Sequence, residues 1–276
     1  MRVLMPANLD QACEMLIAEP GVVPVAGATD VLVHWPVNLD AHDRTYLDLS
    51  GLGELRSIAW SDSTLTLGAM TTYWDTIRDE RIGAEYPLLH AAARQVGAIQ
   101  IQSRGTWAGN IVNASPAADG VPVLMAYDAT VVLASRTQRV RVKLDEFYLG
   151  YKKMRRQPDQ LVVAIELPRR EYTFSVFEKV GARRAQAITK VGVAVTHSAI
   201  GWRVVANSVA PTVCRCRSVE AMLDQDAAVS SPDGFQTAIR TDVTPIDDIR
   251  STAEYREDVL SRLLYHSLRG KCPGVT

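Results

Sequence analysis

The sequence predicts an α+β protein made of two domains. Helix-like and strand-like stretches alternate along the first 170 residues, and the composition then changes at Arg169-Arg170-Glu171. Beyond that point, long strand candidates come first and helices follow, which is typical of a small α+β unit. The chain has 276 residues, of which 47% are hydrophobic and 22% charged, so it can form a sizeable core. We therefore expect one domain over 1–170 and a second over 171–276.

Apolar spacing and turn residues define the elements of the first domain. Residues 8–17 place apolar side chains at helical spacing, and Pro20-Gly21 ends that run. The remaining expected elements are a strand over 21–26, a β-hairpin over 55–60 and 64–67, a helix over 86–96, a strand pair over 131–133 and 140–142, and a strand over 161–165.

The second domain is expected to begin with three strands and to end with helices. The strands are predicted over 174–180, 188–200 and 202–209, and a first helix over 218–223. A final helix over 252–268 would bury an apolar face formed by Tyr255, Val259, Leu263 and Leu264.

Charge and composition argue against several classes of function. Thirty basic and thirty-one acidic residues give a net charge of −1, which disfavours binding nucleic acid through phosphate neutralisation but leaves room for a local basic patch. No apolar run approaches the roughly 18 residues of a membrane span, and no signal-peptide pattern follows Met1, so we expect a cytoplasmic protein. The four cysteines are scattered, and Cys214-Arg-Cys216 lacks the spacing of a metal site, so neither disulfides nor a metal are expected.

A first glycine-bearing segment spans residues 24–30. It follows a Val-rich strand and contains only small residues before Thr29 and Asp30, so its backbone could approach a phosphate closely. Taken alone, the segment is better interpreted as an ordinary turn with Thr29 or Asp30 capping a helix.

A second segment, residues 104–119, is rich in small hydrogen-bonding side chains but also contains residues that favour burial. We expect a semi-buried irregular segment, and a bound polar ligand is one way to satisfy its backbone groups. Neither segment is a dinucleotide fingerprint or a P-loop, yet together they favour a nucleotide-type ligand. Trp107, inside this segment, could cover a flat ring.

The two segments, in this order and separation, resemble motifs of the FAD-binding medium subunit of the molybdenum hydroxylases, the carbon monoxide dehydrogenase and xanthine dehydrogenase type. Residues 26–30 (AGATD) are similar to A-G-G-[TNH]-[DS]. Residues 106–119 (TWAGNIVNASPAAD) are similar to T-I-G-G-N followed by I-x-N-A-S-P-x-x-D. Family-like steps at Glu166-Leu167-Pro168, Phe177-Glu178-Lys179 and 209–212 extend the resemblance over nearly the whole chain.

The resemblance implies a two-part FAD-binding domain of the vanillyl-alcohol-oxidase (PCMH) type over 1–170 and a small α+β C-terminal domain of the carbon monoxide dehydrogenase flavoprotein type over 171–276. It implies an electron-transfer subunit of a heterotrimeric oxidoreductase. The chain would carry FAD, receive electrons from a small [2Fe-2S] subunit, and pass them to NAD, oxygen or a quinone. A large subunit would hold the molybdenum cofactor. Two alternatives stay open: a stand-alone FAD-dependent oxidoreductase, and a scaffold subunit that has lost FAD.

The resemblance also implies which residues bind the cofactor, and it assigns no catalytic acid or base to this chain. The expected FAD-binding residues are Val25, Ala26, Gly27, Ala28, Thr29, Asp30, Thr106, Ala108, Gly109 and Asn110 around the diphosphate, Ser115 and Asp119 at the ribityl or ribose hydroxyls, Gly97 and Ile101 on the flavin side, and Val162 and Lys179 near the ring or the dinucleotide tail.

Two departures from the family motifs concern glycine positions. Ala28 and Ala108 stand where the family usually has glycine. A methyl group disfavours positive φ and crowds a close backbone approach, so FAD would bind more weakly if those positions need either.

Overall fold

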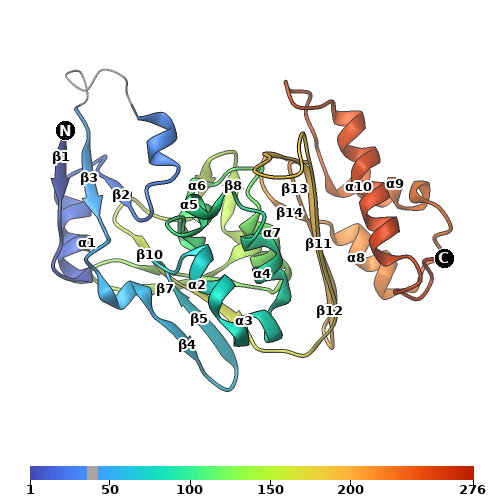
Figure 1. Cartoon of the computed structure of the whole chain (residues 1–276), viewed down its shortest axis with the longest axis horizontal. Coiled ribbons are helices and arrows are strands. Elements are labelled where there is room, and N and C mark those ends of the chain that lie inside the picture. The colour runs from blue at the N-terminus through green and yellow to red at the C-terminus, as the bar shows by residue number, and fades with distance from the viewer. Residues whose placement is uncertain (36–42) are drawn as a thin grey trace.

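The computed structural model describes residues 1–35 and 43–276. Three sheets follow one another along the long axis of the molecule, with helices between the second and third and a helical layer beyond the third (Figure 1). The N-terminus lies at one end of this arrangement and the C-terminus at the other. Among the described residues, no helix combines the length and the apolar character needed to cross a bilayer.

The first sheet is small and parallel. It contains β1 (Arg2–Leu4), β3 (Thr45–Asp48) and β2 (Val23–Val25) in the order β1-β3-β2. Helix α1 (Leu9–Ala18) starts at Asn8, whose side chain accepts a hydrogen bond from Gln11 N. The helix buries the apolar residues that its spacing predicted, so the helix and the Val-rich strand are confirmed. Two 3₁₀ turns belong to this region, η1 (Val31–His34) and η2 (Gly53–Arg56).

The central sheet is antiparallel and has the order β4-β5-β10-β6-β7. The predicted hairpin and strand pair are confirmed, and the predicted strand over 161–165 is the middle strand, where both faces pack against apolar side chains. The strands are β4 (Ile58–Trp60), β5 (Thr64–Gly68), β10 (Leu161–Pro168), β6 (Thr130–Ala134) and β7 (Arg139–Lys143).

Short helices fill the space between the central sheet and the third sheet (Figure 1). Every residue of α7 is buried, because this helix contacts β12 and β13 as well as α4 and α6. These helices are α2 (Tyr73–Arg78), α3 (Glu80–Glu85), α4 (Pro87–Ala93), α5 (Ile99–Gln102), α6 (Trp107–Asn113) and α7 (Gly120–Ala126). The turn η3 (Leu144–Glu146) and the small ribbon of β8 (Tyr148–Gly150) and β9 (Lys153–Met154) follow β7.

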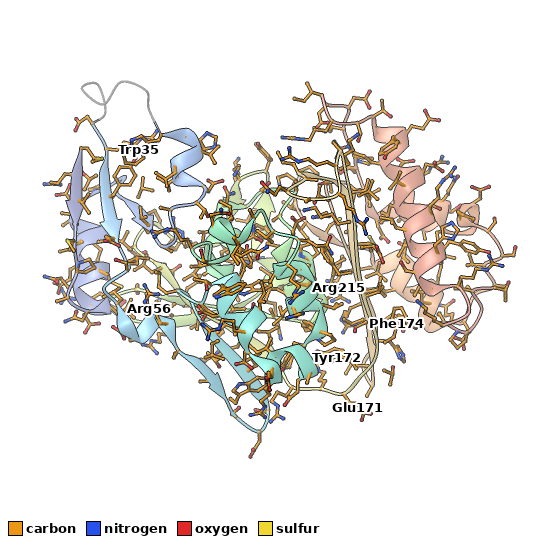
Figure 2. The ribbon with its side chains drawn as sticks, viewed as in Figure 1. Trp35, Arg56, Glu171, Tyr172, Phe174 and Arg215 are labelled. Carbon is orange, nitrogen blue, oxygen red and sulfur yellow. The ribbon has the colours of Figure 1, made fainter. Side chains whose placement is uncertain are left out.

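The C-terminal sheet is antiparallel, in the order β11-β12-β13-β14, and confirms the three predicted strands. Its strands are β11 (Tyr172–Gly181), β12 (Thr189–Ser198), β13 (Gly201–Asn207) and β14 (Cys214–Arg215). Figure 2 shows Tyr172 and Phe174 on opposite sides of β11. A register shift between these two residues explains this, since Tyr172 packs on Tyr127 and Phe174 on Trp202. Helices α8 (Arg217–Asp224), α9 (Gln236–Asp242) and α10 (Ala253–Leu268), with the turn η4 (Pro232–Phe235), cover the outer face.

The buried face of α10 differs from the prediction by one position. Tyr255 is 39% exposed, whereas Leu260, Leu264 and Leu268 are fully buried and Val259 and Leu263 only partly. The cause is Arg256, which occupies the inward position of the first turn. Its guanidinium donates to Lys190 O, Ser208 O and Asp248 Oδ1 at 2.9, 2.6 and 2.7 Å. Hydrophobicity alone assigns an arginine to the solvent side, so the pattern misplaced this face.

The contact between the central helices and the C-terminal sheet has a consistent charge pattern. Asp119, Asp128 and Asp145 precede β11 in the chain, and each pairs with a basic residue that follows it. The pairs are Asp119–Lys179 at 2.5 Å, Asp128–Arg203 at 2.9 Å and Asp145–Arg215 at 3.2 Å. Arg215 lies between the central helices and the last sheet (Figure 2). These pairs hold the sheet against the central helices, because charge-assisted hydrogen bonds are short and directional.

Substitution of Asp128 is expected to change the acid stability. Burial alone would raise the pKa of Asp128, but hydrogen bonds from Arg170 and Arg203 outweigh burial and hold this pKa below its usual range. A lowered pKa means that the stabilisation is complete above about pH 4 and is lost as the pH falls through the folded-state value. Asp128→Asn should lower the free energy of unfolding by about 2 kcal/mol at pH 7, and this difference should shrink below pH 4.

Urea unfolding between pH 3 and 7 checks this expectation. Asp226→Asn is the matched control, because Asp226 also has a positive φ (51°) but is exposed and forms no ion pair with any described residue. A constant difference between Asp128→Asn and the natural chain down to pH 3 would contradict the argument.

Candidate cofactor-binding site

A cavity of about 520 Å³ lies where the first sheet meets the central sheet and its helices. One wall consists of β2 and the residues that follow it, the opposite wall of α5 and α6, and the start of β10 contributes Leu161 and Val162. The volume falls within the range of about 300–1,000 Å³ that is usual for small-molecule and cofactor sites.

The loop after β2 presents unused backbone donors to the cavity. Within the described part of the chain, the amide N–H groups of residues 27–30 donate to no protein acceptor. Ala28 adopts φ 62°, the left-handed conformation, and its carbonyl accepts from Leu32 N at 3.0 Å, which starts the turn η1. Successive free N–H groups around a left-handed residue form an anion-binding concavity.

Gly27 is required by the close approach of two backbones. A Cβ at this position would lie 1.8 Å from Arg104 O and 2.5 Å from Arg104 C. The Arg104 guanidinium Nε also donates to Gly27 O at 3.4 Å. The loop after β2 therefore packs directly against residues 104–105, so the two glycine-bearing segments form one structure.

Residues 104–119 were expected to be irregular, but residues 107–113 of this segment form helix α6. Thr106 caps this helix by accepting a hydrogen bond from Gly109 N at 2.9 Å. Trp107 does not face the cavity but is fully buried, in edge contact with Tyr73 and donating to Thr76 Oγ1 at 3.3 Å. Ala108 lies in the first helical turn with an ordinary φ, and its N–H has no intrahelical acceptor.

Side chains tie the two walls together at the cavity edge. Asn113 Nδ2 donates to Asp30 Oδ1 at 2.9 Å, and Lys152 Nζ donates to Asn113 Oδ1 at 2.8 Å and to Asn113 O at 2.5 Å. Asn110 Oδ1 accepts from Gly120 N at 3.1 Å, which connects α6 to the start of α7. These bonds hold the walls at a fixed separation.

Most of the site residues implied by the sequence line this cavity. They are Val25, Ala26, Gly27, Ala28, Thr29, Asp30, Ile101, Thr106, Ala108, Gly109, Asn110 and Val162. The others, Gly97, Ser115, Asp119 and Lys179, lie outside the lining.

Of the residues outside the lining, Gly97 contacts a lining residue, and the other three form hydrogen bonds elsewhere. Gly97 has φ 53°, and a Cβ there would lie 2.8 Å from the Ile101 side chain, so glycine allows Ile101 to pack closely. Ser115 Oγ accepts from Ala117 N at 3.2 Å. Burial raises the pKa of Asp119, against the opposing influence of Lys179 and Thr189, whose polar atoms each lie 2.5 Å from its carboxylate.

Several lining residues carried no signal in the sequence. Leu49, Met70, Leu161 and Tyr73 look like ordinary core residues, and only the fold brings them to the cavity. Arg156 lies in a polar turn after β9, where an arginine is unremarkable. The motif letters around Gly105 and Asn113 did mark their segment.

The residues present suit a phosphate-bearing cofactor with a long, partly apolar body. The free N–H groups of 27–30 can accept an anion, and the close packing at Gly27 forms their cradle. The rest of the cavity is largely aliphatic, which suits flat rings.

Comparison with known proteins identifies this cofactor. Residues 1–170 match the family model described as the FAD binding domain in molybdopterin dehydrogenase, and residues 176–270 match the CO dehydrogenase flavoprotein C-terminal domain. The chain belongs to the FAD-binding subunits of the molybdenum hydroxylases. As in that family, it is an α+β oxidoreductase subunit that carries an FAD-binding domain followed by the flavoprotein C-terminal domain.

Individual FAD-binding subunits are similar over most of the chain. A xanthine dehydrogenase FAD-binding subunit from Escherichia coli is 29% identical and covers 91% of this chain and 88% of the relative. The glyceraldehyde dehydrogenase medium chain of Sulfolobus acidocaldarius is 30% identical over 68% of this chain and 67% of its own length. Carbon monoxide dehydrogenase from Hydrogenophaga pseudoflava superimposes with a TM-score of 0.88 at 26% identity, covering 97% of this chain and 96% of that one.

The two alanines that depart from the family motif are expected to respond in opposite directions to glycine. Ala28 is held at positive φ, so Ala28→Gly should raise the free energy of unfolding by about 0.5–1 kcal/mol. Ala108 is helical, so Ala108→Gly should lower it by up to about 1 kcal/mol. Urea unfolding of both variants checks the pair, and a gain at position 108 would contradict the argument.

Proposed function

We propose that this chain is the electron-transfer subunit of a multi-subunit molybdenum hydroxylase, working with a large molybdenum-cofactor subunit and a small iron–sulfur subunit. The observation that carries this proposal is the cavity between the two glycine-bearing segments, with its row of free N–H groups. When bound, FAD supplies two-electron redox chemistry, taking electrons from the [2Fe-2S] subunit and delivering them to NAD, oxygen or a quinone.

The protein's own part is to bind and orient. The N–H groups of residues 27–30, together with that of Ala108, are proposed to hold the diphosphate, and Thr106 to fix the start of α6. The other lining residues would contact the rest of the cofactor. Gly97 is proposed to shape the flavin side through its close contact with Ile101. Ser115 and Asp119 are proposed to act at the ribityl or ribose hydroxyls, and Lys179 near the ring or the dinucleotide tail.

The test begins with an affinity-tagged chain isolated from its native host under mild conditions. We expect a yellow complex with flavin absorption bands, a released mass equal to FAD, and two further polypeptides that carry molybdenum and iron. Reduction of the complex without oxygen, followed by NAD, oxygen or a quinone in separate samples, identifies the acceptor by the return of the flavin bands.

The rival functions give different results in the same experiment. A stand-alone FAD-dependent oxidoreductase would be yellow, would have no molybdenum- or iron-containing partner, and would be reduced by a substrate of its own. A scaffold subunit would be colourless and would take up no added FAD. Either result would overturn the proposal.

A further inference from the structure

Arg156 lines the cavity and forms no ion pair with a described carboxylate, although Asp159 interacts with it electrostatically at longer range. Its Nη1 donates to the backbone carbonyls of Gln160 at 2.7 Å and Gln157 at 3.3 Å. Within the described residues, no aspartate or glutamate lies within ion-pair distance of this guanidinium. Burial lowers the pKa of Arg156, yet a guanidinium remains protonated. A partly buried charge of this kind costs free energy unless a ligand interacts with it.

The turn that carries Arg156 is fixed before any ligand arrives. Gln160 N donates to Gln157 O at 3.1 Å, and Gln157 N donates to Gln160 Oε1 at 2.9 Å. The guanidinium bonds to the carbonyls of this same turn, so side chain and turn support each other. Nε and Nη2 keep their donors free of protein acceptors among the described residues.

Arg156 reaches the cavity beside the start of β10. Its partner Gln160 directly precedes Leu161, and the cavity here is lined by Leu161, Val162 and Leu49. Val96 and Ile101 line the α5 side of the cavity, next to Gln95, whose carbonyl accepts from Lys179 of the C-terminal sheet. The free N–H groups of 27–30 belong to the wall formed by the loop after β2.

We propose that Arg156 binds the adenosine half of FAD and makes the cavity selective for the dinucleotide over FMN. The inference rests on the proposed placement of FAD in this cavity. Adenine is flat, neutral and rich in nitrogen acceptors. A planar guanidinium recognises such a ring by stacking and by donating hydrogen bonds, while Leu49 and Leu161 offer aliphatic surface to it.

The experiment compares the affinities of FAD and FMN for the full-length chain after removal of its cofactor, measured by quenching of flavin fluorescence. Arg156→Met keeps the length of the side chain and removes its charge and donors. We expect its Kd for FAD to rise about 10-fold and its Kd for FMN to stay unchanged. Arg156→Lys keeps the positive charge but loses the planar guanidinium. We expect a smaller rise in its Kd for FAD and no change in its Kd for FMN.

Arg155→Met is the matched control, because this neighbour is exposed, donates to Glu146 O at 2.7 Å and does not line the cavity. Circular dichroism checks the fold of each variant. An unchanged Kd for FAD in Arg156→Met would overturn the inference. An equal rise for FMN would overturn it too, because the arginine would then act on the phosphate or the ring. Failure of the unmodified chain to bind FAD would instead overturn the proposed function.

Discussion

Gly27→Ala is expected to weaken FAD binding by about 10- to 100-fold. The new methyl group would lie 1.8 Å from Arg104 O, and both partners are backbone, so no side-chain rotation can relieve the clash. Overpacking of this kind costs about 1–3 kcal/mol, and each 1.4 kcal/mol corresponds to a tenfold change in Kd. The loop after β2 must shift away from residues 104–105, which also moves its free N–H groups out of position.

Flavin-fluorescence titration of the cofactor-free chain measures this effect. Gly51→Ala is the matched control, since a Cβ at Gly51 meets no atom of the described chain within 4 Å and its φ is not positive. The control should bind FAD like the natural chain. Equal affinity of Gly27→Ala and the control would show that the two segments need not touch.

Asp119→Ala should be strongly destabilising. The side chains of Asp119 and Lys179 are only 11% and 6% exposed, and their charged atoms lie 2.5 Å apart. Removal of one partner from a buried pair leaves the other charge uncompensated, at a cost of about 3–5 kcal/mol. Thr189 and Lys179 both lose an acceptor in the same substitution.

Urea unfolding without FAD isolates this contribution from cofactor binding. Asp258→Ala removes an exposed pair with Arg262, whose side chains are 43% and 63% exposed, and should cost less than about 1 kcal/mol. The double variant Asp119→Leu with Lys179→Met removes both charges and should recover much of the loss. If Asp119→Ala lowered the free energy of unfolding no more than Asp258→Ala does, the argument would fail, because water would then solvate the Lys179 charge.

The sequence marked the walls of the cavity better than it predicted their local structure. Small residues at 26–30 and 105–110 marked both walls, because close backbone packing and free N–H groups demand small side chains. Helix α6 escaped prediction because its buried face consists of Trp107, Ala108 and Ile111 in one short stretch. Seven residues are too few for helical periodicity to be visible.

Other features could not be read from the sequence because they depend on distant contacts. Arg156 became part of the cavity only through the fold, and Arg256 was assigned to solvent although its partners, Lys190 O and Ser208 O, bury it. The conformation of Ala28 also required the structure, since alanine gives no sign of a positive φ. Glycine stands at this position in the family motif, which suggested a positive φ, and Ala28 does have one.

The two walls of the cavity belong to different hydrophobic cores, so the width of the cavity depends on how these two cores pack against each other. The loop after β2 is anchored by the core around Leu47, whereas α6 is anchored by the core around Trp107 and Ile111. We therefore expect cofactor affinity to depend on residues that never touch the cofactor. A smaller side chain at Leu47 should loosen the packing of one wall, and the amide donors proposed to hold the diphosphate would then meet it at a changed spacing.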